Sequence, residues 1–415
     1  MEVKTLLNDV LREIKPKGKE VEKEVAAMLR RINAQLKKDK LKAKAITGGS
    51  IAKGTFLAYD HDCDIFVQFS KSYGDEDISL PLGRSLKKIF PSLISLHGSR
   101  DYYQVRNRLN FEIVPVLSIK RPEEALNITD CSPLHVAWVK KFPKLADEIR
   151  LTRAFCKANG VYGAESYIKG FSGHVIDIIT IHYGGFLKLL EAARKWKDKT
   201  VIDHHNAHTG KALKELNSSK LVSPLILIDP VEPSRNAAAS LSEEKFRLFI
   251  QKAGEFLRHP SKAYFIRPQF SVAMLEKKAE GKRLLLVKAA PIKGKEDVVG
   301  AKLLKVFEFI RDETRKYGFV LHDAGWHWDR KGEATCHYIF DKAPIASSYA
   351  RQGPPAEMKE HAEAFRKMHK KTFLKDGRLW AMIVREHTLP ERFITSLLKH
   401  PYLKDKAKRL AAAVR

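Results

Sequence analysis

The amino-acid sequence predicts a multi-domain α+β protein. The chain has 415 residues, more than one ordinary domain, and 44% of them are hydrophobic, enough for a core in each domain. Short strands alternate with helices in the first third, helices fill the middle, and the last third mixes both again.

Positive charge is in large excess. Lys and Arg number 76 against 49 Asp and Glu, giving a formal net charge of +27. Such an excess indicates a polyanionic partner, and RNA or DNA is favoured over a membrane surface because no basic amphipathic helix with bulky aromatics stands out. No apolar run reaches the roughly 18 to 20 residues of a membrane span, and no apolar signal core follows the first residues. We therefore expect a soluble, cytoplasmic protein.

The first third is predicted to start with a helix over residues 19–38, whose apolar residues recur at helical spacing. A strand over residues 42–47 then runs into a glycine-rich turn. The elements expected after that turn are a strand, a helix and three strands, over residues 62–69, 82–90, 93–97, 102–106 and 108–117.

The turn that follows the first strand is suited to a triphosphate. Gly49 and Gly54 allow positive φ and close backbone approach. Ser50 and Thr55 offer hydroxyls, and Lys53 offers a cation. The G-x-x-x-x-G spacing also suggests a P-loop, but a P-loop needs Lys directly after the second glycine, where this chain has Thr.

Three carboxylates interrupt the strands that follow. Side chains alternate along a strand, so Asp62 and Asp64 share one face while Cys63 and Ile65 take the other. Magnesium prefers hard oxygen ligands, usually one or two carboxylates completed by water and phosphate. Glu112, on the strand over residues 108–117, is the third carboxylate that a two-metal site would use. The alternatives are a solvated acidic strand end for the pair and a strand-edge charge for Glu112.

The middle third is predicted to contain helices over residues 144–159 and 173–195. Arg150, Arg153 and Lys157 form a basic stripe on the first of them. This stripe is either the solvated face of the helix or a phosphate contact. The second helix is apolar on most sides, as expected for the centre of a helical domain.

The last third is predicted to be α+β. The expected strands cover residues 264–270, 284–290, 320–328, 335–340 and 378–385, and the expected helices cover 298–317 and 357–371. Residues 351–355 are interpreted as a break, and the basic, alanine-rich end over 404–415 is expected to fray. Trp326, His327 and Trp328 are interpreted as strand-face packing, with stacking on bases or ribose as the alternative.

Two groups of residues that could bind zinc are interpreted otherwise. The four cysteines lie far apart without a CxxC pair, so we expect them to be small buried or half-buried residues: Cys63, Cys131, Cys156 and Cys336. His204, His205 and His208 lie in a polar stretch without cysteine or carboxylate spacing, and we expect a surface loop there.

The segment from Gly48 to Asp64 resembles the signature of the nucleotidyltransferase superfamily: a Gly-Ser, then a Thr, then a carboxylate pair on the next strand. Four later segments resemble the archaeal class I CCA-adding enzymes, in the same order. They are DCSPLH at 130–135 with Trp138, LTRAFCKANGVYG at 151–163, KGFSG at 169–173 and IDPVEPSRN at 228–236. The Gly-Pro-Pro at 353–355 and the basic helix after it are similar too.

The resemblance implies a head, a neck, and a body with a tail. The head would be the catalytic nucleotidyltransferase domain over residues 1–143, with a mixed sheet. The helical neck, 144–259, would recognise the nucleotide base, and the α+β body and tail, 260–415, would bind tRNA. The implied activity is template-independent addition of C, C and A to the 3′ end of tRNA from CTP and ATP, with Mg²⁺ as cofactor. The family also suggests a homodimer.

The resemblance also implies roles for individual residues. Asp62, Asp64 and Glu112 would be catalytic and bind the metal. Nine residues would bind the nucleotide: Gly49, Ser50, Lys53, Thr55, Ser132, His135, Lys157, Ser166 and Arg235. Ser50 and Lys53 would contact the triphosphate. His135 and Lys157 would hold the ribose and phosphates. Arg235 would read the Watson–Crick edge of the incoming base.

The chain departs from the family pattern at five of these positions. The first carboxylate, Asp62, is usually Glu and the third, Glu112, is usually Asp. Lys53 replaces an Arg and Ser132 stands where Thr is common, so chemical type is kept at four positions. Ser166 lies where a phosphate-binding Tyr is expected, next to Tyr167. There are two alternatives on the same fold. A poly(A) or oligoadenylate-type transferase would share the turn and the carboxylates, whereas a non-catalytic RNA-binding protein would be expected to have lost a carboxylate.

Overall fold

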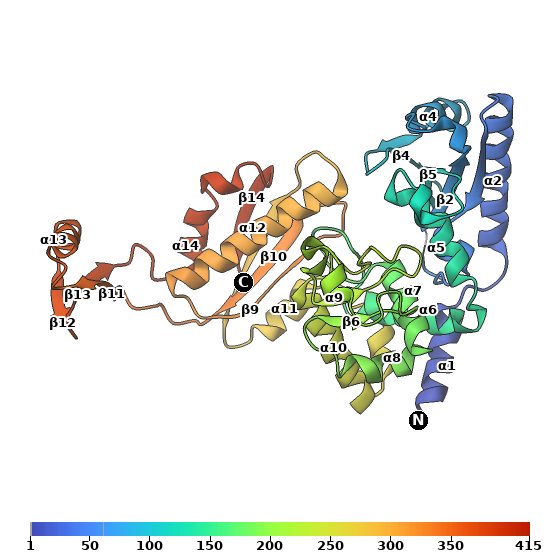
Figure 1. The fold of residues 1–415 in the computed structure, drawn as a ribbon. Helices are drawn as coiled ribbons and strands as arrows, with labels where there is room; N and C mark the ends of the chain where they lie inside the picture. Colours follow the sequence, from blue (N-terminus) through green and yellow to red (C-terminus); the bar gives the residue numbers. More distant parts are fainter. Residues whose placement is uncertain (1, 61) are drawn as a thin grey trace. The chain divides into compact units, whose positions relative to one another are not determined.

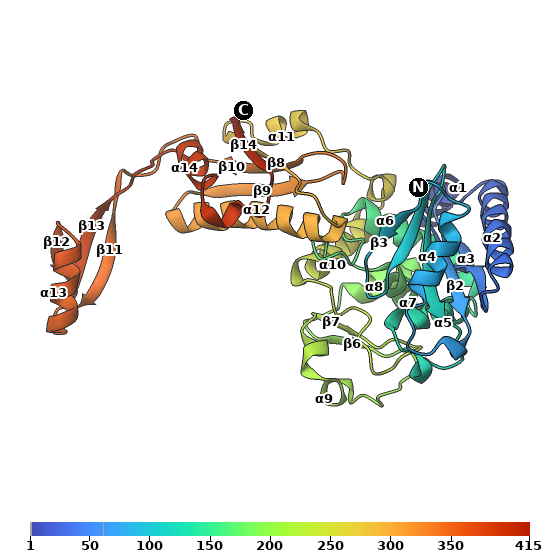
Figure 2. The ribbon, with the colours of Figure 1, turned by 90° about the horizontal axis from the view of Figure 1, so that it is seen from above.

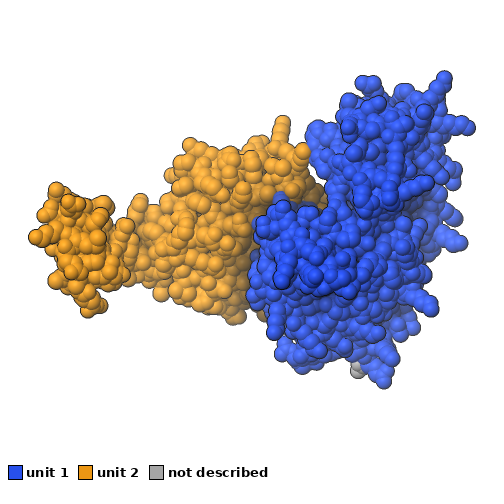
Figure 3. Space-filling view, in the orientation of Figure 1, with its two compact units in different colours: residues 1–268 blue, residues 269–415 orange. Residues whose placement is uncertain are grey.

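The computed structural model describes residues 2–60 and 62–415. The chain forms two compact units, residues 1–268 and 269–415 (Figure 3). Within the described residues, no helix combines the length and the apolar character needed to cross a membrane. The predicted α+β class is confirmed, since helices and sheets are mixed in both units.

The N-terminal part of the first unit is built on a five-stranded mixed sheet of order β1-β2-β5-β4-β3 (Figure 1). Its strands are β1 (Ala43–Thr47), β2 (Asp62–Phe69), β3 (Ile94–Leu96), β4 (Tyr102–Arg106) and β5 (Asn110–Leu117). β2 and β5 run parallel, and the other neighbours are antiparallel. All five strands predicted in the first third are confirmed.

The two faces of this sheet have different neighbours. One face packs against α2 (Glu20–Lys38) and α4 (Ser79–Lys87), with Ile32, Ile65 and Phe111 in one buried cluster. On the other face lie α3 (Gly49–Lys53) and α5 (Ser132–Val139), where Phe66 and Val136 pack together. The predicted alternation along β2 is therefore confirmed, and its two aspartates point to the face of α3 and α5.

The helical part of the first unit has one large core. It contains α1 (Val3–Ile14), α6 (Ala146–Ala158), α7 (Gly173–Tyr183), α8 (Phe186–Ala193) and α10 (Glu243–Arg258). The single helix predicted over 173–195 is wrong, because α7 ends at Gly184 and Gly185, whose φ angles are 74° and 133°. α1 belongs to this core although it precedes the sheet in sequence (Figure 2).

The basic stripe on α6 does not face solvent. Arg150 donates to the carbonyl oxygens of Gly54 and Phe56, and Lys157 pairs with Asp60. Arg153 donates to Asp177 on α7, and both arginines are buried. The interpretation as a solvated helix face is therefore wrong. The stripe ties α6 to the loop that leads into β2.

A short segment joins α8 and α10. It contains β6 (Thr200–Ile202) and β7 (Leu225–Leu227), which pair in parallel, and α9 (Ala212–Glu215). The histidines at 204, 205 and 208 lie in the loop after β6, where His205 and most of its neighbours are exposed. The expected surface loop is confirmed.

The second unit contains two sheets. The first is antiparallel, of order β14-β8-β10-β9, and its strands are β8 (Arg283–Ala290), β9 (Leu321–His327), β10 (Ala334–Phe340) and β14 (Arg409–Val414). It packs against α12 (Glu296–Tyr317) and α14 (Pro390–Leu397), with α11 (Val272–Lys278) beside a separate small cluster. Trp326 and Trp328 pack against the main cluster, so strand-face packing is confirmed. All four cysteines are buried and free.

The second sheet has the order β11-β13-β12, with α13 (Lys359–Met368) packed beside it. Its strands are β11 (Ser348–Pro355), β12 (Thr372–Lys375) and β13 (Arg378–Val384). The break predicted over 351–355 is wrong. Pro354 and Pro355 end a strand at the edge of the sheet, where a missing N–H costs no ladder bond.

Two further predictions for the C-terminal third are wrong. Residues 264–270 are not a strand; a 3₁₀ turn covers Lys262–Phe265. The end of the chain does not fray, because β14 pairs with β8 along its whole length, from Arg409 opposite Ala290 to Val414 opposite Leu285. Composition could not indicate this strand, since its order comes from a ladder with a distant partner.

Removal of residues 409–415 is expected to lower the melting temperature by about 5 to 10 °C, because β8 loses a whole ladder of backbone hydrogen bonds. Thermal unfolding measured by circular dichroism checks this. A chain carrying Ala411→Ser and Ala413→Ser keeps the ladder and is expected to melt like the parent. An unchanged melting temperature after truncation would show that the end frays.

Candidate active site

The structure brings the three predicted carboxylates to neighbouring positions. In the parallel pair of β2 and β5, Asp64 lies opposite Glu112 and Asp62 lies opposite Asn110. Register partners in adjacent strands share a face, so all three acids lie on the face of α3 and α5. The Asn110 side chain donates to Asp62 Oδ1 at 3.2 Å, which fixes one of the acids.

The surroundings of Asp64 disfavour its negative charge, so that a cation nearby would stabilise it. Its burial raises the pKa, and the neighbouring Asp62 raises it further, while Lys53 and Arg153 lower it. Two like charges close together are costly unless positive charge compensates them. Hard oxygen donors gathered on one face of the sheet fit a divalent cation. Asp62, Asp64 and Glu112 are therefore the residues that could hold a metal ion.

The backbone of the glycine segment touches this carboxylate. Residues 49–53 form the short helix α3, so the expected turn is helical, and Gly54 ends it in the left-handed region at φ 68°. Gly49 has φ 52°, and a Cβ placed there would lie 1.7 Å from Asp64 Oδ2. Glycine is thus required at position 49 both by conformation and by space.

Lys53 reaches from α3 to the helical part of the unit. Its Nζ lies 2.7 Å from Asp177 Oδ2, and its side chain is 9% exposed while that of Asp177 is fully buried. Arg153 approaches the other oxygen of Asp177 at 3.3 Å. Burial raises the pKa of Asp177, but the two cations outweigh it and hold the pKa below its usual value. Asp177 is therefore an ionised anchor for Lys53.

A second buried carboxylate, Asp229, has three basic side chains close to one of its oxygens. Asp229 Oδ2 lies 3.1 Å from His135 Nε2, 3.5 Å from His174 Nε2 and 3.1 Å from Arg235 Nη1. Asp229 Oδ1 accepts the backbone N–H groups of Val231 and Glu232. Despite burial, contacts with the two histidines hold the pKa of Asp229 well below its usual range. The structure thus connects two of the predicted nucleotide-binding residues, His135 and Arg235.

Two imidazoles and a carboxylate within 4.8 Å of one another could also hold a metal ion. Burial lowers the pKa of His174 to about 4, so its ring is neutral at pH 7, as a metal ligand requires. The guanidinium of Arg235, however, lies on the same oxygen of Asp229 and would repel a cation there. We therefore call this group, His135, His174, Asp229 and Arg235, the hub at Asp229 and assign it no metal.

The remaining predicted residues lie around these two groups. Ser132 is the first residue of α5, which carries His135 one turn later. Lys157 pairs with Asp60 and lies 4.8 Å from the centre of the Tyr162 ring. Thr55 is fully buried. Ser166 lies in a tight turn in which the N–H groups of Ile168 and Lys169 donate to the carbonyl of Glu165.

Sequence reasoning missed three residues of these groups: His174, Asp177 and Asp229. The first two lie three positions apart on α7, inside a helix whose other buried residues are aliphatic except for Thr180. Polar residues at that spacing on one face of a buried helix indicate buried partners, so the signal was present. Asp229 follows the buried strand β7, and nothing in the sequence links it to His135.

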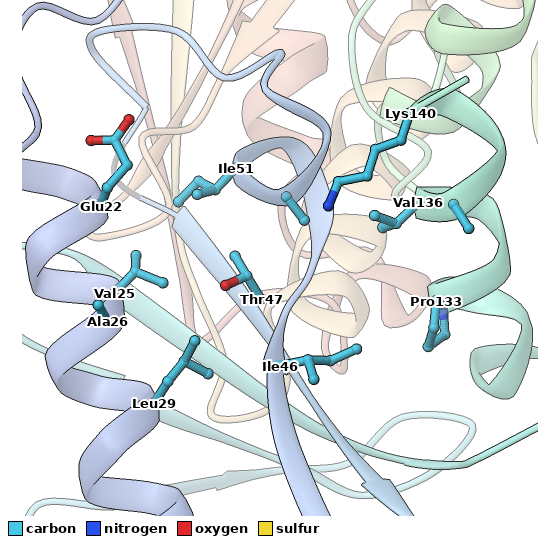
Figure 4. A pocket seen from close by; sticks show the side chains of 12 residues that line it. Glu22, Val25, Ala26, Leu29, Ile46, Thr47, Ile51, Pro133, Val136 and Lys140 are labelled. Carbon is cyan, nitrogen blue, oxygen red and sulfur yellow. The ribbon is translucent and has the colours of Figure 1, made fainter. Parts of the chain in front are cut away.

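A pocket of about 510 Å³ lies beside the site but does not contain it (Figure 4). α2, β1, α3 and α5 line it, largely with aliphatic side chains such as Val25, Leu29 and Ile46. Glu22 and Lys140 are the charged side chains of the lining. None of the three carboxylates belongs to it.

Comparison with known proteins agrees with this geometry. Residues 29–135 match the family described as nucleotidyltransferase domain, residues 147–266 match tRNA nucleotidyltransferase, second domain, and residues 281–405 match CCA-adding enzyme, C-terminal domain. The structure is similar to that of a cytoplasmic RNA terminal U-transferase, with a TM-score of 0.51 at 14% identity, over 65% of this chain and 99% of that one. The fold and the carboxylate-bearing sheet define a nucleotidyltransferase.

Relatives over most of the chain define the family more closely. The CCA-adding enzyme of Nanoarchaeum equitans is 37% identical over 81% of this chain and 82% of its own length. That of Methanocaldococcus jannaschii is 30% identical over 93% of this chain and 88% of its own length. The chain belongs to the CCA-adding enzyme family.

Proposed function

We propose that this chain adds C, C and A to the 3′ end of tRNA, using CTP and ATP without a nucleic-acid template and releasing pyrophosphate. Membership of the CCA-adding enzyme family supports this activity. The observation that carries it is the placement of Asp64 opposite Glu112 on neighbouring strands, with Asp62 on the same face. A non-catalytic protein on this fold would be expected to have lost a carboxylate, and all three are present.

The mechanism is proposed to use two metal ions, both Mg²⁺, held by Asp62, Asp64 and Glu112. Bound there, they would supply Lewis-acid stabilisation of the α-phosphate and a lower pKa for the attacking tRNA hydroxyl. The three carboxylates would hold the ions, and Ser50 and Lys53 would orient the triphosphate for in-line attack. No covalent intermediate with the protein is needed.

The nucleotide is proposed to lie between the carboxylates and the hub at Asp229. Ser50 and Lys53 would contact the triphosphate, and His135 and Lys157 the ribose and phosphates. Arg235 would donate hydrogen bonds to the Watson–Crick edge of the base. Its side chain is 34% exposed, and only its Nη1 is paired among the described residues, so other N–H groups of the guanidinium are available. C and A both present an acceptor ring nitrogen at the centre of that edge, where U and G present an N–H, so one donor would serve both C and A.

Other nucleotide contacts, at Gly49, Thr55, Ser132 and Ser166, stay predictions. So does the division into head, neck, and body with tail at 143 and 259. We propose that the exposed lysines on and after α13, Lys367, Lys370 and Lys371, hold the tRNA backbone by charge and shape, without sequence readout. A homodimer and a cytoplasmic location are proposals as well.

One incubation tests the activity. Purified protein is mixed with tRNA that lacks its CCA end, Mg²⁺, CTP and ATP, and the products are resolved to single nucleotides. We expect addition to stop after CCA. A continuing run of A would favour the poly(A) or oligoadenylate-type alternative, and no addition would contradict the proposal.

Arg235→Ala is expected to reduce the preference for CTP and ATP over UTP and GTP by about tenfold or more, because the incoming base loses its charged donor. The check is the kcat/KM of all four triphosphates on truncated tRNA. Arg247→Ala is the matched control, since Arg247 lies on α10 and is exposed, paired with Glu243. Selectivity equal to that of the control would remove Arg235 from base choice.

A further inference from the structure

The cations proposed to contact the nucleotide do not stand alone. Lys53 and Arg235 are each held by a different buried aspartate of the helical part of the first unit. Lys53 pairs with Asp177 on α7, and Arg235 pairs with Asp229 after β7. We propose that Asp177 and Asp229 are positioning residues with separate tasks, Asp177 aligning Lys53 on the triphosphate and Asp229 aligning Arg235 on the base. This inference rests on the function proposed above.

Asp177 is built to hold Lys53 rather than to bind substrate. It is fully buried, and each of its oxygens faces a different cation, Lys53 at 2.7 Å and Arg153 at 3.3 Å. Arg153 comes from α6, whose other basic residues hold the loop into β2. The lysine side chain has many rotamers, so fixing Nζ at one point removes an entropic cost that binding of phosphate would otherwise carry. The charge of Lys53 also reaches Asp64, where it lowers the pKa.

Asp229 fixes Arg235 through the backbone and the side chain together. Its N–H donates to the carbonyl of Arg235, and its Oδ2 accepts from the guanidinium. The loop between them is tied by the N–H of Arg235, which donates to Glu232, and by His208, which contacts the carbonyl of Pro233. A guanidinium clamped at one end presents its remaining N–H groups in one direction, which base discrimination requires.

The same oxygen of Asp229 also faces His135 on α5 and His174 on α7. His135 is the proposed ribose contact, so the base reader and the sugar contact both lie against one carboxylate oxygen. A base that displaces Arg235 from Asp229 would therefore disturb His135 as well. A mismatched base would therefore weaken the contacts of both Arg235 and His135, rather than those of Arg235 alone.

The two aspartates are matched controls for each other, because both are fully buried and both hold cations. Asp229→Asn is expected to lower the preference for CTP and ATP over UTP and GTP by about tenfold, with pyrophosphate inhibition unchanged. Asp177→Asn is expected to raise the KM for CTP and ATP alike by about tenfold and to weaken pyrophosphate inhibition equally, with base preference unchanged. Steady-state kinetics on truncated tRNA measure both quantities.

Two outcomes of these measurements would contradict the proposed division of tasks. If both variants change selectivity and pyrophosphate inhibition in the same proportion, or if neither variant changes either quantity, the division of tasks is wrong. Melting temperatures identify a variant that does not fold, and Asp177→Ser and Asp229→Ser, which keep an acceptor oxygen in a smaller side chain, then replace it. Arg235→Ala and Lys53→Ala are run alongside. If they leave selectivity and pyrophosphate inhibition intact, the proposed roles of these cations fail; if they change them while the aspartate variants do not, only the present inference fails.

Discussion

Asp64→Asn is expected to lower nucleotide incorporation by about 1,000-fold or more while tRNA binding stays intact. The substitution removes a carboxylate from the proposed metal site. The lysines proposed to hold tRNA belong to the second unit and are unchanged. Primer-extension assays on truncated tRNA measure the first quantity, and filter binding measures the second. Asp75→Asn, at an exposed loop position of the same part of the chain, is the control and is expected to keep full activity.

The Asp64→Asn variant also distinguishes a loss of activity from a loss of stability. Burial raises the pKa of Asp64, so the folded protein disfavours the charged form relative to the unfolded chain, and this cost grows as the pH rises through the ordinary pKa of an aspartate. A neutral asparagine avoids the cost. The variant is therefore expected to melt at the same temperature as the parent or higher at pH 7. Retained incorporation would remove Asp64 from the catalytic centre, and a lower melting temperature would contradict the electrostatic argument.

Gly49→Ala is expected to lower incorporation by about 100-fold and the melting temperature by about 5 °C. The new Cβ would lie 1.7 Å from Asp64 Oδ2, so the carboxylate has to move, and the residue would also be held at φ 52°. Gly74→Ala is the matched control, because Gly74 has φ 51° and nothing within 4 Å of its would-be Cβ. The Gly74→Ala variant therefore measures the effect of backbone strain without a steric clash. Equal activity in the two variants would mean that contact with Asp64 has no role in the reaction.

The strands of the catalytic sheet were predictable because their signal is local. The period-two alternation along residues 62–69 and 110–117 separates the carboxylates from the core residues, and the structure keeps that separation. The position of Asp64 opposite Glu112 was harder to predict from the sequence. The two strands run parallel and are joined by a long crossover, and the alternation of side chains along each strand does not say how the strands align. Glu112 was proposed as a third acid, but its place opposite Asp64 comes from the fold.

The supports of the site depend on contacts between distant segments. Lys53 and Asp177 are 124 positions apart, and no local sequence pattern near either residue indicates that the two form an ion pair. The stripe of Arg150, Arg153 and Lys157 shows the same limit. Helical spacing correctly put the three on one face, but that spacing cannot tell a solvated face from one covered by a loop from another part of the chain.

The position of α1 has a consequence for the order of events during synthesis. Leu6, Leu7 and Val10 are buried in a cluster with Phe155 and Phe256, which leave the ribosome much later. The sheet that carries the carboxylates lies between these two segments in sequence. Because α1 is translated long before these partners, it waits for them, and until then its apolar side needs protection from other chains.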